Sequence, residues 1–153
     1  MATDKQLEAL TQFRRNLGDL AYRRREWQGV ATQIAKILAE RVRELKEETD
    51  FALVLQEHGS GDDRTLQLGM GRWPIRSADE QVTTESGALL FIDLTMSGHV
   101  RFTFAPSFIG KDDDARRETL GTEEPDETAM KVDDYLAAFL ERAVKTHCSA
   151  RKR

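Results

Sequence analysis

The chain has little of what stabilises secreted proteins or anchors membrane proteins. Its 153 residues include one cysteine, Cys148, so no disulfide can form within the chain. No stretch approaches the roughly 18 apolar residues that span a bilayer. The first residues, MATDKQLEAL, lack the basic segment and apolar core of a secretory signal. These absences predict a cytoplasmic protein without membrane association, folded as a single domain over residues 1–153.

Motifs for catalysis, cofactors and metals are also lacking. The chain has neither the GxxxxGK[ST] phosphate loop nor the G-x-S-x-G nucleophile elbow. Its histidines, His58, His99 and His147, do not follow the spacing of zinc ligands. The acidic run 112–114 lacks the alternating ligands and central glycine of a calcium loop. The sequence therefore predicts no catalytic residue, no cofactor and no metal, and leans away from an enzyme.

Residues 1–48 have the composition and spacing of a long helix. Thr3 and Gln6 form a capping-box pattern at its start. Residues spaced alternately three and four positions apart then form a seam along one side of the helix, as in a coiled coil. All of its eleven positions except Arg24 and Arg41 are apolar: they are Leu10, Phe13, Leu17, Leu20, Arg24, Trp27, Ala31, Ile34, Leu38, Arg41 and Leu45. A helix of about 45 residues would be about 67 Å long, whereas a domain of this size is about 30–40 Å across. Either the helix is broken near residues 18–29, where Gly18 and Gly29 lie, or its N-terminal half projects and needs a partner.

Residues 51–105 change to the alternating pattern of strands and predict an antiparallel sheet of about four strands. The clearest hairpin joins 88–95 to 100–105, and a three-residue loop at 97–99 is favoured because it sets Leu94 opposite Phe102. Residues 77–87 are polar and indicate a loop. Residues 106–124 are expected to form an acidic loop, since 106–127 carry eight acidic and three basic side chains. A C-terminal helix is predicted over 125–148, starting at Pro125. This order predicts the α+β class.

Two further features suggest binding surfaces. The strand around 88–94 is apolar on both faces, so either the two helices cover opposite faces of the sheet or one face binds a partner. The helix also carries a basic cluster interleaved with aromatic residues. Its candidate nucleic-acid contacts are Arg14, Arg15, Arg23 and Arg25. Arginine binds phosphate bidentately and aromatic rings stack on bases, although a solvated helix flank explains the same pattern.

These patterns favour a non-catalytic protein–protein interaction module that self-associates as a homodimer and acts as an adaptor, regulator, chaperone or inhibitor. Interface centres favour Phe, Trp and Arg. The predicted interface residues are Phe13, Leu17, Leu20, Arg24, Trp27, Ala31 and Ile34. The alternative is a nucleic-acid-binding protein that uses the arginine cluster. A third hypothesis is a small-ligand-binding protein or an enzyme, with a pocket between the sheet and the C-terminal helix.

Overall fold

The structure, a computed structural model, describes residues 1–49, 53–70, 72–76, 81–85, 88–106 and 117–151. At 72–76, 81–85, 106 and 146–151 it describes the backbone alone. The helices are α1 (Asp4–Thr49) and α2 (Val132–Arg151), with short 3-10 helices η1 (Gly61–Asp63), η3 (Pro125–Glu127) and η4 (Ala129–Lys131). The strands are β1 (Leu53–His58), β2 (Thr65–Met70), β3 (Arg72–Arg76), β4 (Gln81–Glu85), β5 (Ala88–Leu94), β6 (Val100–Pro106) and β7 (Glu118–Glu123).

The predicted α+β class is confirmed, with five strands in the main sheet where about four were expected. The sheet has the order β1-β2-β5-β6-β7, and β3 and β4 form a separate two-stranded hairpin. All neighbouring strands are antiparallel. Their register aligns Leu66 with Ile92 and Ile92 with Phe102, so these side chains share one face.

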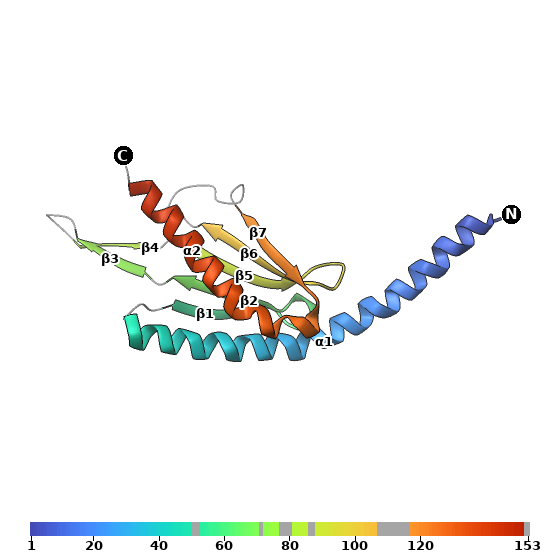
Figure 1. The fold of residues 1–153 in the computed structure, drawn as a ribbon, viewed down its shortest axis with the longest axis horizontal. Helices are drawn as coiled ribbons and strands as arrows, with labels where there is room; N and C mark the ends of the chain where they lie inside the picture. The colour runs from blue at the N-terminus through green and yellow to red at the C-terminus, as the bar shows by residue number, and fades with distance from the viewer. Residues whose placement is uncertain (50–52, 71, 77–80, 86–87, 107–116, 152–153) are drawn as a thin grey trace.

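Both long helices cover this face (Figure 1). Trp27, Ile34 and Phe139 are fully buried there, in one core with the apolar side chains of β2, β5 and β6. Of the two alternatives for the strand that is apolar on both faces, the one in which the helices cover opposite faces of the sheet is therefore wrong. On the other face Leu89 and Phe91 are half-buried, and the Arg117 guanidinium lies 5.0 Å from the centroid of the Phe91 ring.

The hairpin of β5 and β6 has a three-residue loop, but it is 96–98 and not 97–99. The Thr95 N–H donates to the His99 carbonyl at 2.8 Å and closes this loop. Leu94 lies opposite Val100, so its predicted pairing with Phe102 is wrong. The reason is Gly98, whose φ of 84° makes it the left-handed last residue of the loop.

Two segments predicted as loops contain strands. Within 77–87 the backbone of β4 pairs with β3, and within 106–124 β7 pairs with β6; residues 107–116 lie outside the described part of the chain. β7 is one of the two edge strands of the sheet. Its sequence, ETLGTE, is mostly polar and has one large apolar residue, Leu120, so it lacks the alternation that identifies a strand.

The predicted start of the C-terminal helix, Pro125, is seven residues too early. Pro125 begins η3, η4 follows, and α-helical structure starts at Val132. The buried Thr128 lies between the two short helices and its hydroxyl donates to the Glu124 carbonyl at 2.8 Å. Such side-chain bonds compete with regular helix formation, which explains the delayed start.

Helix α1 is continuous over 46 residues, so the alternative of a break near residues 18–29 is wrong. Neither Gly18 nor Gly29 marks a close contact, since a Cβ at either position would meet nothing within 4 Å. The helix is too long for the body of the protein, and its N-terminal half extends beyond it (Figure 1).

Candidate protein-interaction surface

The N-terminal half of α1, residues 4–22, is called the arm. At 1.5 Å per residue it is about 28 Å long. Most of the large hydrophobic side chains that are exposed in the described part of the chain lie on the arm or just before it: Met1, Leu7, Leu10, Phe13, Leu17 and Tyr22. Exposed apolar residues scattered singly need no explanation, but a contiguous group indicates an interaction surface. The arm is therefore the first candidate for a functional site.

The arm begins with the predicted capping box. The Thr3 N–H donates to Gln6 Oε1 at 3.0 Å, and the Gln6 N–H donates to Thr3 Oγ1 at 3.3 Å. These two bonds satisfy backbone groups that a helix start leaves free. Farther along, Gln12 Nε2 donates to Asn16 Oδ1 at 3.1 Å, one helical turn later. The arm is thus a helix with a defined start.

The predicted interface residues fall into two groups. Phe13 and Leu17 are 60% and 47% exposed, and Leu20 and Arg24 are half-buried. The other three, Trp27, Ala31 and Ile34, are fully buried in the chain's own core. The seam of α1 is therefore covered by the sheet from Trp27 onward and uncovered toward the N-terminus. Only its uncovered part is available to a partner.

The base of the arm is held to the body by the β5–β6 loop and by Arg23. Arg23 Nη1 donates to the Ser97 carbonyl at 3.3 Å, and Arg23 Nε lies 3.2 Å from Glu124 Oε2. A Cβ at Gly98 would lie 2.9 Å from the Cβ of Arg23, so the loop lies directly against the helix. Farther along α1, the Trp27 indole donates to the Arg64 carbonyl at 3.1 Å. These contacts are called the clamp, and they position the arm relative to the sheet.

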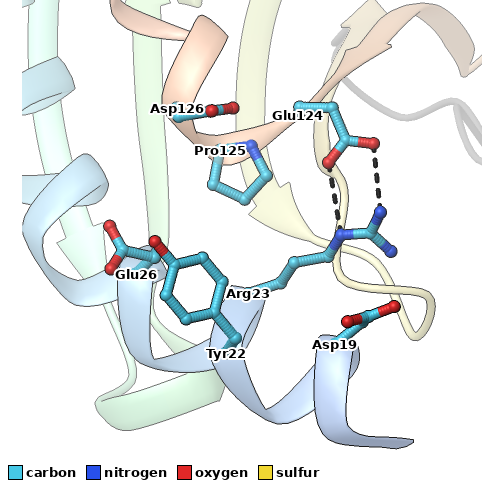
Figure 2. A pocket seen from close by; sticks show the side chains of 7 residues that line it. All are labelled: Asp19, Tyr22, Arg23, Glu26, Glu124, Pro125 and Asp126. Atoms are coloured by element: carbon cyan, nitrogen blue, oxygen red, sulfur yellow. Dashed lines mark hydrogen bonds and ion pairs between the residues drawn. The ribbon is translucent and has the colours of Figure 1, made fainter. Parts of the chain in front are cut away.

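A pocket lies beside the clamp (Figure 2). It is lined by Asp19, Tyr22, Arg23, Glu26, Glu124, Pro125 and Asp126. Four of these side chains are carboxylates, and one cation, Arg23, already pairs with Glu124. Asp19, Tyr22 and Glu26 come from α1 and are exposed. The pocket is open and five of its seven lining residues are charged, unlike the mostly apolar clefts in which proteins bind small molecules.

One polar cluster at the clamp resembles part of a catalytic triad. Ser97 Oγ lies 2.9 Å from His99 Nδ1, and His99 Nε2 lies 3.1 Å from Glu124 Oε1. Glu124 is shared with Arg23, however, and Ser97 Oγ also lies 3.0 Å from Thr95 Oγ1. Ser97 and His99 do not line the pocket. Nucleophilic catalysis needs a site for the reacting atom beside the nucleophile, so we assign this cluster to holding the turn.

Sequence reasoning missed this cluster of Ser97, His99 and Glu124. His99 and Glu124 are 25 positions apart and belong to different elements, so no local pattern connects them. The only local signal nearby was Gly98, which predicted a tight turn and not its partners.

The arginine cluster is divided by the fold. Arg23 is bound in the clamp, and Arg24 Nε lies 3.8 Å from Asp62 Oδ2. Arg14, Arg15 and Arg25 are exposed. The candidate contacts for nucleic acid thus do not form one basic face, because Arg23 is engaged with a carboxylate and the acidic pocket lies next to it.

In the part of the chain that the structure describes, no group of three or more metal-ligating side chains comes together. No helix there is long and apolar enough to cross a membrane. Comparison of the chain with protein-family models, curated proteins and solved structures finds no match. A functional proposal for this protein therefore rests on the geometry of the arm and the clamp.

Proposed function

We propose that this protein is a non-catalytic protein–protein interaction module that self-associates through the exposed seam of its arm. We define this seam as the exposed Leu10, Phe13 and Leu17 and the half-buried Leu20, with the exposed Leu7 beside it. The observation that carries the proposal is the division of one continuous seam into a half covered by the chain's own sheet and a half that is uncovered.

The physical chemistry of a projecting helix supports a partner. Isolated helices shorter than about 12–15 residues are marginal in water, and most helices in proteins are stabilised by packing of an apolar face. The arm is only slightly longer than this limit, and Gly18 makes the helix about 1 kcal/mol less stable than alanine at the same position would. Packing of the exposed seam against another helix would supply further stabilisation.

A second copy of the chain is a suitable partner because coiled-coil packing is self-complementary. Side chains at alternating steps of three and four fit between those of an identical helix. The exposed seam is only about two heptads long, which is short for a coiled coil. We therefore expect a weak dimer, with a dissociation constant on the order of 10 μM. A cytoplasmic adaptor, regulator, chaperone or inhibitor is compatible with such an association.

Solution mass measured by light scattering from roughly 1 to 200 μM tests this proposal. The wild type is expected to pass from monomer to dimer over this range. The double variant Phe13→Asp, Leu17→Asp places charges in the seam and is expected to stay monomeric with an unchanged circular dichroism signal from the sheet.

The matched control is Thr11→Asp, Gln12→Asp, which adds the same two charges to the same part of the arm away from the seam. It is expected to associate like the wild type. A wild type that stays monomeric throughout, or a seam variant that dimerises as well as the control, contradicts self-association through the arm. Trp27 and Ile34 are unsuitable for this test because both are fully buried, and a charge there would unfold the chain.

A further inference from the structure

We infer that the two arms of the dimer run antiparallel, so that the tip of each arm, near Asp4, packs beside the clamp of the second copy. This inference rests on the proposed function and adds the orientation of the partner. Two observations carry it: where the seam becomes covered, and where the apolar side chains of the arm lie.

The covered half of the seam limits how far a second helix can follow the arm. From Trp27 onward the seam positions are occupied by the chain's own sheet, since Trp27, Ala31, Ile34 and Leu38 are all buried in its core. A second helix packed on the seam must therefore end or leave before Trp27.

Only an antiparallel partner meets this limit without rearrangement. Helix α1 starts at Asp4, just after the Thr3 cap. The N-terminus of an antiparallel second arm therefore lies near the clamp of the first copy. The body of the second copy then lies at the opposite end of the pair of arms. A parallel arm would instead continue through the rest of α1, as far as Thr49, into the space of the sheet.

The helix dipoles favour the same orientation. They are opposed in an antiparallel pair of arms and aligned in a parallel pair.

The apolar side chains of the seam define the register, with Leu20 half-buried beside the β5–β6 loop. Setting Leu10 opposite Leu20 and Phe13 opposite Leu17 of the second copy makes four consecutive apolar layers, because each pairing occurs twice across the two-fold axis. This register brings the tip to the β5–β6 loop of the second copy. Met96 in that loop is 88% exposed and would extend the apolar contact.

Distance measurements between spin labels test the orientation. The chain's only cysteine, Cys148, is replaced by serine, and a label is attached at Lys5→Cys, which lies off the seam. In the antiparallel pair residue 5 lies opposite residue 25 of the second copy. The two labelled positions are then separated along the helices by about 20 residues, or about 30 Å at 1.5 Å per residue. In a parallel pair they are separated by about the 8–10 Å between helix axes.

Disulfide trapping gives a second, independent reading. Chains with Leu10→Cys are mixed with differently tagged chains with Leu20→Cys, both in the Cys148→Ser background. The antiparallel register predicts a disulfide between the two kinds of chain. A parallel pair instead predicts disulfides between chains of the same kind.

The outcomes separate the inference from the function that it rests on. A dimer by light scattering with labels about 30 Å apart and mixed disulfides supports the antiparallel pair. A dimer with labels about 10 Å apart and same-kind disulfides overturns the orientation and leaves self-association through the arm intact. A dimer with labels well beyond the antiparallel distance, without either disulfide, overturns the arm as the interface. A monomer at every concentration overturns both.

Discussion

Two side chains of one seam should respond in opposite ways to the same truncation. Leu17 and Ile34 both occupy the heptad seam of α1, but Leu17 is 47% exposed and Ile34 is 0% exposed. We predict that Ile34→Ala lowers the free energy of unfolding of the monomer, whereas Leu17→Ala leaves it nearly unchanged. For association the order reverses, because Leu17→Ala removes an interface side chain.

The magnitudes follow from burial. Truncating a fully buried isoleucine to alanine costs about 2–5 kcal/mol, through lost apolar contact and the cavity that remains. For a chain of this length each 1 kcal/mol lowers the melting temperature by about 2–4 °C, so a loss of about 3 kcal/mol lowers it by about 6–12 °C. Substitution of an exposed side chain usually changes stability by less than about 0.5 kcal/mol, and alanine is the better helix former.

Urea denaturation followed by circular dichroism measures both changes at about 1 μM, where a dimer with a dissociation constant of about 10 μM is largely dissociated. Light scattering at about 100 μM then measures association of Leu17→Ala against the wild type. If Leu17→Ala at the low concentration loses as much stability as a buried truncation, about 2 kcal/mol or more, the arm packs on its own body. That result would refute the division of the seam into a covered and an exposed half.

Two further predictions concern the body. Gly98→Ala should lower the free energy of unfolding by about 2–5 kcal/mol, the sum of backbone strain at φ 84° and overpacking of the new Cβ against Arg23 at 2.9 Å. Gly61→Ala, with φ of 60° but nothing within 4 Å, should cost only the backbone strain of about 1–2 kcal/mol. Equal urea midpoints for the two variants would contradict the clamp. Burial and the hydrogen bond from the Tyr135 hydroxyl to Glu123 raise the pKa of Tyr135 above its ordinary 10.0. The neutral form of Tyr135 therefore stabilises the fold below pH 10, and this contribution is lost as pH rises above 10. The urea midpoint of the wild type should fall more steeply between about pH 9 and 11 than that of Tyr135→Phe, and parallel curves would contradict the raised pKa.

The helical parts of the fold could be predicted because their determinants are local. The capping box of Thr3 and Gln6 and the spacing of the seam are read within one or two turns, and both appear in the structure. The acidic segment was harder to predict. β7 contains Gly121, where the backbone lies so close to the Tyr135 ring that a Cβ would overlap its hydroxyl. That close packing helps to place the edge strand, and Tyr135 belongs to another element, so the local pattern could not reveal it.

The candidate site, too, was predictable only where it depends on local sequence. The sequence identified the seam and its excess length, but it could not show which half is exposed, because the heptad pattern is the same on both sides of Arg24. Burial of Trp27 depends on the sheet, and its indole bonds to the carbonyl of Arg64, which is 37 positions away. The clamp likewise joins Arg23 to Glu124, which are 101 positions apart.

Local sequence was sufficient for the α+β class, the long helix and the seam that runs along it, because helix propensity, capping and periodicity act between near neighbours. It was also sufficient to show that an unbroken helix over residues 1–48 would be longer than one domain can cover. The tertiary structure was needed to show that the helix is unbroken, that both helices cover one face of the sheet and that the seam is uncovered before Trp27. Those features depend on which distant side chains meet, and burial of a seam depends on what packs against it and not on its own pattern.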